Sequence, residues 1–188
     1  MKKSLLVLST LFAALAANAS DYSVQMQDYL NANVRAWQNA SVLVEAIRAQ
    51  NVRHSAISQV EIDNLDTEWR SQVGKANAPL ISKVIENPAS EFLRKIVAES
   101  GGQITEIFVM DSHGLNVASS GVTSDYWQGD EAKFSDTFGK GPAARHFGEV
   151  ELDESTQTYQ GQASLVIVDP DTGLPIGALT IGLNAESL

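Results

Sequence analysis

Apolar residues in the first half of the chain recur mostly at intervals of three and four, the spacing that places side chains on one face of a helix. Between residues 21 and 50 this stripe contains Tyr22, Met26, Leu30, Val34, Trp37, Val44 and Ile47. We therefore expect residues 21–50 to form mainly a long helix with one buried face.

Shorter apolar runs predict further helices up to residue 100. One run contains Ile57, Val60, Leu65, Trp69 and Val73. Gly74 is placed to end it, and a short run from Leu80 to Ile85 follows. Asn87-Pro88 then starts another helix, because asparagine is a good N-cap and proline is favoured at the first helical position. Gly101-Gly102 ends that helix.

Beyond residue 102 the pattern changes to strand-like runs. Ile104 to Met110 and Leu115 to Ser119 flank a turn, Asp111 to Gly114, in which Asp can bond its downstream backbone and Gly can take a positive φ. Phe147 to Leu152 predicts a third strand. Tyr159 to Val168 and Ile176 to Leu183 predict a second hairpin around a Pro-Gly turn. One helical turn is expected between Asp130 and Thr137.

Helices followed by antiparallel strands predict an α+β fold. We expect a single domain over residues 20–188, helical over 21–100. One antiparallel sheet of about five strands should cover 104–183, with the long N-terminal helix along one side.

The first 19 residues have the features of a secretory signal peptide. Lys2 and Lys3 precede an apolar run, Leu5 to Ala16, that is short for a membrane span, and Ala17-Asn18-Ala19 is an A-x-A cleavage site. Cleavage would start the mature chain at Ser20, and an uncleaved anchor helix is the alternative. The pattern fits bacterial secretion, so we expect a periplasmic protein.

The amino-acid composition excludes several kinds of ligand and bound group. The chain has 13 basic and 23 acidic residues and a net charge of −10, so polyanions are repelled and nucleic-acid binding is not expected. Solubility alone also explains this acidity. The absence of cysteine excludes disulfides, thiolate metal sites and c-type haem attachment. Neither a metal-site spacing of the three histidines nor a G-x-S-x-G motif is present, so we expect no metal, no cofactor and no enzymatic activity.

The stretch from Ile104 to Glu131 resembles the Cache (PAS-like) sensor domains of bacterial extracytoplasmic receptors. In those domains a D-x-x-G-x-x-v-a-s hairpin, here Asp111 to Ser119, precedes a D-Y-W-x-x-D-E segment, here Asp125 to Glu131. The resemblance covers roughly residues 30–185. It implies a stand-alone PAS-like domain with a small-molecule pocket bordered by the second motif. No membrane-spanning run follows in the chain, so the resemblance implies a separate membrane-bound partner, such as a receptor or kinase.

Three pairs of candidate ligand-binding residues follow the first hairpin. Tyr126 and Trp127 offer flat apolar area with polar handles, and anchoring of a loop is the alternative role. Asp130 and Glu131 could pair a ligand ammonium or cap the short helix after them. Arg145 could bind a carboxylate with two parallel bonds, with His146 as a third donor, or form a surface ion pair.

The late strands supply further candidates. Alternation along a strand places Gln162, Ser164 and Val166 on one face, either toward a pocket or toward water. Tyr159 belongs to the same strand. Asp169 is expected to start the Pro-Gly turn, and the Cache resemblance adds a possible contact with a ligand amine.

Two functions fit these features. The first is a periplasmic module that binds a small polar metabolite (an amino acid, organic acid or amine) and acts with a membrane-bound receptor or kinase. The second is a PAS-like interaction protein without a ligand pocket, which forms a homodimer or pairs with another chain through its long helix.

Overall fold

The computed structural model describes residues 22–153 and 158–188. The predicted signal peptide and its cleavage site lie outside these residues. Within the described ranges, no helix is both long and apolar enough to cross a membrane.

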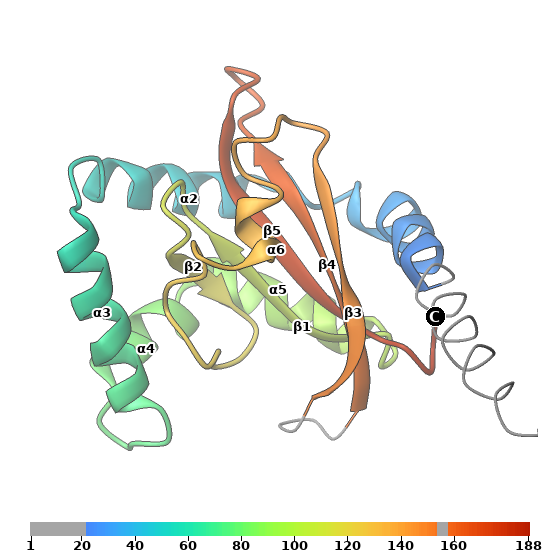
Figure 1. Ribbon diagram of the computed structural model, residues 1–188, viewed down its shortest axis with the longest axis horizontal. Helices are drawn as coiled ribbons and strands as arrows, with labels where there is room; N and C mark the ends of the chain where they lie inside the picture. Colours follow the sequence, from blue (N-terminus) through green and yellow to red (C-terminus); the bar gives the residue numbers. More distant parts are fainter. Residues whose placement is uncertain (1–21, 154–157) are drawn as a thin grey trace, which may run out of the picture.

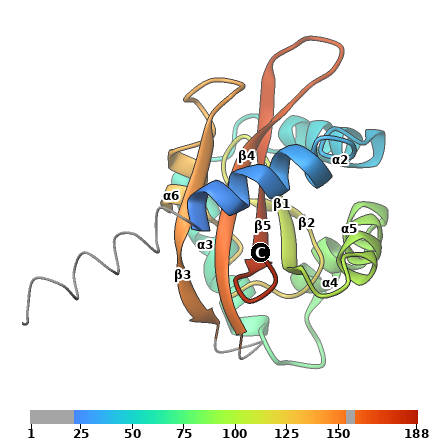
Figure 2. The same cartoon turned by 90° about the vertical axis from the view of Figure 1, so that its right-hand side faces the viewer.

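The N-terminal region is helical, as the spacing predicts, but it is not one continuous helix. Residues 22–29 are α-helical and run into a π-helical turn, η1 (Leu30–Val34). The next helix, α2 (Ser41–Arg53), starts only after Ala40, whose ψ of 138° leaves the helical region. Figure 2 shows the first segment crossing the sheet and α2 continuing along the same side. The break lets Met26 and Leu30 before it and Val44 and Ile47 after it all reach the core.

Three more helices follow, α3 (Gln59–Gln72), α4 (Pro79–Ile85) and α5 (Pro88–Glu99). The predicted N-cap of α5 is confirmed, because the Asn87 side chain accepts a hydrogen bond from the Ser90 N–H at 2.9 Å. The predicted buried stripe on α3 is partly wrong. Trp69 is buried as predicted, but Val60 and Val73 are 68% and 44% exposed, because a helix that begins at Gln59 turns Ile62 to the interior in place of Val60.

The five strands are β1 (Ile104–Met110), β2 (Asn116–Ser119), β3 (Arg145–Asp153), β4 (Thr158–Val168) and β5 (Pro175–Asn184). They form one antiparallel sheet in the order β2-β1-β5-β4-β3. A short helix, α6 (Ala132–Ser135), lies in the long connection between β2 and β3. The predicted α+β fold with a five-stranded antiparallel sheet is therefore confirmed (Figure 1).

The turn between β1 and β2 has the predicted chemistry. Asp111 Oδ1 accepts hydrogen bonds from the N–H groups of His113 and Leu115 at 2.8 and 3.0 Å, and Gly114 has φ +83°. Asp111 Oδ2 accepts a bond from Gln50 at 3.0 Å and lies 2.8 Å from His54 Nδ1. A fully buried carboxylate thus ties the hairpin to α2.

The sheet has two differently covered faces. One face packs against the N-terminal helical segment, α2 and α5, and it supplies the main core from side chains such as Ile107, Leu165 and Leu179. The opposite face carries Phe108, Met110 and Ala178, and α6 covers it with Phe134. The Phe134 ring stacks on Phe138 at 5.2 Å. Each face also borders a hollow.

Candidate functional site

The first hollow is a groove of about 370 Å³ between α6 and strands β3 and β4, which we call the α6 groove. Its lining comprises Glu131, Ala132, Lys133, His146, Gly148, Glu149, Glu151, Leu152, Gln160 and Gln162. Three of the residues expected to bind a ligand, Glu131, His146 and Gln162, therefore lie together. Glu131 lies at the start of α6, His146 on β3 and Gln162 on β4. The fold brings these three side chains to one side of the sheet.

Two glutamines on β4 define the inner wall of the α6 groove. The Nε2 groups of Gln160 and Gln162 donate to Glu106 Oε1 at 3.2 and 3.0 Å. These side chains belong to β4 and β1, and they meet across β5 at Gly182, which pairs with both Glu106 and Gln162. A Cβ on Gly182 would lie 2.8 Å from Gln160 Oε1 and from Glu106 Cγ. The missing side chain at this position therefore allows the contact.

Lys133 forms the opposite wall, and its charge is already matched. Its ammonium lies 2.9 Å from a Glu131 carboxylate oxygen and donates to Gln128 Oε1 at 3.2 Å. It also lies 5.4 Å from the centre of the Phe108 ring. Glu131 occupies the N-cap position of α6 but its side chain makes no capping bond, so its partner is Lys133.

Carboxylates outnumber cations around this groove. Glu131, Glu149 and Glu151 line it, whereas Lys133 and His146 are the basic groups among its lining residues. His146 Nδ1 lies 3.5 Å from a carboxylate oxygen of Asp136. Because Lys133 is paired with Glu131, the groove presents a negative potential that suits a positively charged ligand group.

Arg145 does not share the groove with His146. Neighbouring residues of a strand point to opposite faces of a sheet, so Arg145 lies on the face that packs against the N-terminal helical segment. There, burial lowers the pKa of the Arg145 guanidinium, and the nearby charge of Arg35 lowers this pKa further. Its Nη1 donates to Ala144 O at 2.9 Å. The structure thus does not form the expected clamp of Arg145 and His146.

Tyr126 and Trp127 anchor the connection after β2, which is the alternative role weighed for them. Both backbone N–H groups donate to Asp66 Oδ1 of α3, at 2.9 and 3.1 Å. Tyr126 stacks on Trp69 with ring centres 5.3 Å apart, and Trp127 Nε1 donates to His113 O at 2.8 Å. Tyr126 also borders the second hollow, whereas Trp127 lines neither of the two.

The remaining candidates lie apart from the α6 groove lining. Asp130 and Tyr159 are exposed. Ser164 shares a face with Gln162, as alternation predicts, but it is buried and bonds to Thr180 at 2.9 Å. Asp169 starts the Pro-Gly turn, as expected, with Oδ1 accepting the N–H of Asp171 at 2.9 Å. Its carboxylate also pairs with Arg48 of α2, whose Nε lies 2.6 Å from Oδ2.

Five polar residues in or behind the α6 groove were not predicted from the sequence: Glu106, Lys133, Glu149, Glu151 and Gln160. A charged residue on a predicted strand is usually solvated, and nothing local shows that Glu106 meets Gln162 across a glycine on a third strand. Among the described residues, no group of three or more potential ligands could hold a metal ion.

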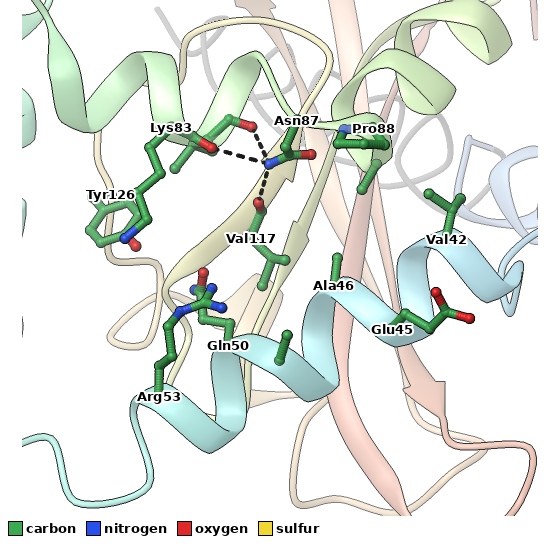
Figure 3. Close-up of a pocket in the computed structure, with 13 residues that line it drawn as sticks. Val42, Glu45, Ala46, Gln50, Arg53, Lys83, Asn87, Pro88, Val117 and Tyr126 are labelled. Atoms are coloured by element: carbon green, nitrogen blue, oxygen red, sulfur yellow. Dashed lines mark hydrogen bonds between the residues drawn. The ribbon is translucent and has the colours of Figure 1, made fainter.

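The second hollow, of about 310 Å³, lies on the other face of the sheet, between α2 and the junction of α4 with α5 (Figure 3). We call it the α2–α5 pocket. Its lining comprises Val42, Glu45, Ala46, Ala49, Gln50, Arg53, Lys83, Val84, Asn87, Pro88, Ala89, Val117 and Tyr126. Of the residues predicted to bind a ligand, Tyr126 alone belongs to this set.

Comparison with known proteins finds solved structures that are similar to this chain. No family model matches the chain, and no curated protein matches it. The sensor domain of the V. cholerae histidine kinase DctB is 10% identical, with a TM-score of 0.38, over 91% of this chain and 57% of that one. The isoleucine-bound sensory domain of the Campylobacter jejuni chemoreceptor Tlp3 is 11% identical, with a TM-score of 0.41, over 77% and 59%.

An extracellular ligand-binding receptor from Desulfohalobium retbaense is 13% identical, with a TM-score of 0.40, over 80% of this chain and 26% of that one. The chain thus spans under two thirds of these structures. Its similarity is to sensor domains of histidine kinases and chemoreceptors.

Proposed function

We propose that the protein is an extracytoplasmic sensor module that binds a small polar metabolite in the α6 groove and acts with a separate membrane-bound receptor or kinase. The observation that carries this proposal is the convergence of Glu131, His146 and Gln162 on one groove from three elements. Polar groups that converge on a hollow from different elements are typical of ligand sites, because they fix a ligand's orientation.

The charges of the groove specify the ligand further. Glu149 and Glu151 project from β3 with no cation paired to them among the described residues, and Glu131 is paired with Lys133. An ammonium group would pair with these carboxylates, and the amides of Gln160 and Gln162 would bond to neutral polar atoms. Amino acids and amines therefore fit better than organic acids.

The extracytoplasmic location in this proposal rests on the expected signal peptide. The proposed ligands are small and polar, and a periplasmic module would meet them before they cross the inner membrane. The membrane-bound partner would then read the ligand-bound state of the module.

The test is a thermal-shift screen of the mature chain against amino acids, putrescine, choline, succinate and citrate, with calorimetry of each compound that raises the melting temperature. Binding to the native state raises that temperature by mass action. We expect an ammonium-bearing compound to bind and Gln162→Ala with Glu149→Gln to reduce its affinity about tenfold or more.

Asp130→Asn and Tyr159→Phe are the matched controls, because both side chains are exposed and outside the groove. They should leave the affinity unchanged. A ligand whose affinity does not respond to the groove variants would place the binding site elsewhere and overturn the proposal.

Pairing through the N-terminal helix is the alternative function. Val24 is 59% exposed on that helix, which is the observation that favours a partner surface there. Sedimentation of the mature chain and of Val24→Glu distinguishes the two. A dimer that the substitution dissociates would support pairing, and a monomer in both would exclude a homodimer through this face.

A further inference from the structure

The α2–α5 pocket has one polar end and one apolar wall. Figure 3 shows the side chains of Arg53, Gln50, Lys83 and Tyr126 gathered at one end, with Ala46, Val42 and Pro88 toward the other. The apolar wall also includes Ala49, Val84 and Val117. Small alanines on α2 leave space where larger side chains would close the gap between α2 and α5.

Hydrogen bonds keep this space open. Asn87 Nδ2 donates to Val84 O at 2.8 Å and to Val117 O at 3.0 Å. Ser90 Oγ donates to Val84 O at 2.6 Å and accepts the Ser119 N–H at 2.8 Å. The start of α5 is thereby fixed to β2, so the position of this wall does not depend on contact with α2.

The polar end carries two cations. Arg53 and Lys83 lie in the last turns of α2 and α4, where the helix dipole favours positive charge. Among the described residues neither has an ion-pair partner, although acidic residues outnumber basic ones in the chain by 23 to 13. The buried carboxylate of Asp111 is bonded to Gln50, His54 and two backbone N–H groups. An anionic group at this end would be attracted by both cations.

Tyr126 adds a neutral donor between these cations. Its side chain is buried and held against Trp69, so the hydroxyl has a fixed position. Burial raises the pKa of this hydroxyl well above its usual value, and the hydroxyl therefore keeps its proton at neutral pH. A protonated hydroxyl can donate to a carboxylate oxygen.

We propose that the α2–α5 pocket is a second binding site, which takes a small monocarboxylic acid with a hydrocarbon chain. Its carboxylate lies against Arg53, Lys83 and the Tyr126 hydroxyl, and its chain lies along Ala46, Ala49 and Val117. Glu45, two helical turns or about 12 Å before Arg53 along α2, lies at the opposite end of the lining and disfavours a second carboxylate there. This site is independent of the proposed α6 groove, because the sheet separates them.

The test uses hexanoate, with hexylamine and acetate as matched ligands, in titration calorimetry of the mature chain. Hexanoate should bind. Hexylamine, with the same chain and the opposite charge, should not displace hexanoate from this pocket, and acetate, without the chain, should bind at least tenfold more weakly than hexanoate. Arg53→Gln and Lys83→Gln should each weaken hexanoate binding about tenfold. Tyr126→Phe keeps the stacking on Trp69 and should weaken binding by a smaller factor.

Four further variants distinguish the possible outcomes. Ala49→Leu should block the apolar wall and abolish binding, whereas Lys75→Gln, an exposed lysine after α3, should not alter it. Gln162→Ala and Glu149→Gln in the α6 groove should also leave it unchanged, so failure of one site can be told from failure of the other. No binding of hexanoate, or binding that is equal in Arg53→Gln, Ala49→Leu and the unsubstituted chain, would overturn the proposal.

Discussion

The two hollows lie on opposite faces of one sheet and differ in charge. Glu131, Glu149 and Glu151 line the α6 groove, whose one lysine is already paired. Arg53 and Lys83, without ion-pair partners among the described residues, line the α2–α5 pocket. A chain with a net charge of −10 thus has one hollow lined mainly by carboxylates and another that contains two cations unpaired within the described ranges. The ligands that we propose for the two hollows therefore rest on the local arrangement of side chains and not on the net charge.

The hollows also differ in how the backbone builds them. The α6 groove depends on strand alternation and on one glycine, Gly182, over which Glu106 and Gln162 meet. The α2–α5 pocket depends on helix spacing, with Ala46 and Ala49 on one side of α2, and on side-chain bonds that fix α5 to β2. Substitutions can therefore disturb one hollow and leave the other intact.

The largest effect is expected from Asp111→Ala. The substitution removes a fully buried acceptor from Gln50 and from the N–H groups of His113 and Leu115. Unpaired buried donors should lower the free energy of unfolding by about 3 kcal/mol or more, as measured by urea denaturation. Asp130→Ala, at an exposed carboxylate, should change this free energy by less than about 0.5 kcal/mol. Equal effects of the two substitutions would refute a structural role for Asp111.

Gly182→Ala should disturb the α6 groove alone. The added methyl group would meet Thr105 Oγ1, Gln160 Oε1 and Glu106 Cγ, so these side chains would have to shift. Because the short Thr105 side chain donates to Gln160 and must shift with it, the free energy of unfolding should also fall, by about 1 kcal/mol. Ligand affinity of the α6 groove should fall by roughly tenfold. Hexanoate binding to the α2–α5 pocket should not change, and calorimetry of both ligands would show whether the two sites respond together instead.

The Arg48–Asp169 pair makes the attachment of α2 dependent on pH. Hydrogen bonds from Arg48 hold the pKa of the Asp169 carboxyl well below its usual value of about 3.9. A folded-state pKa below the unfolded value stabilises the protein above about pH 4, and this stabilisation is lost as the pH falls further. Arg48→Gln should therefore lower the melting temperature at pH 6, and its difference from the unsubstituted chain should narrow toward pH 3. A difference that stays constant with pH would contradict this account of the pair.

The smallest effects are expected at two candidates that lie outside both hollows. Trp127→Phe should remove the bond to His113 O and slightly lower the melting temperature, without changing ligand affinity at either site. Arg145→Gln should likewise leave both affinities unchanged, because this side chain lies on the helix-covered face away from the α2–α5 pocket lining. A large loss of metabolite binding in either variant would show that the substituted residue belongs to the binding site.

Local chemistry made much of the fold predictable. Three features depend only on residues that are neighbours in sequence. They are the helix start at Asn87-Pro88, the turn at Asp111 and the change to strands after Gly101-Gly102. The structure contains all three as predicted. The break at Ala40 was not predictable in this way, because no proline, glycine or capping bond marks it. Apolar residues on both sides of the break pack into the same core.

The candidate sites were less predictable, because they depend on contacts between distant elements. Glu131, His146 and Gln162 could be named from their residue types and their expected positions. Arg145 could not be separated from His146 without knowing that β3 runs through both residues, which sends their side chains to opposite faces. Arg53 and Lys83 belong to different helices, and no spacing in sequence relates them.

The most direct test of the central claim is calorimetry of an ammonium-bearing ligand from the screen against the mature chain, with Gln162→Ala and Glu149→Gln combined in one variant. The account predicts measurable binding that weakens at least tenfold in this variant and persists in Asp130→Asn. Equal affinity in the groove variant, or binding of none of the amino acids and amines tested, would contradict it.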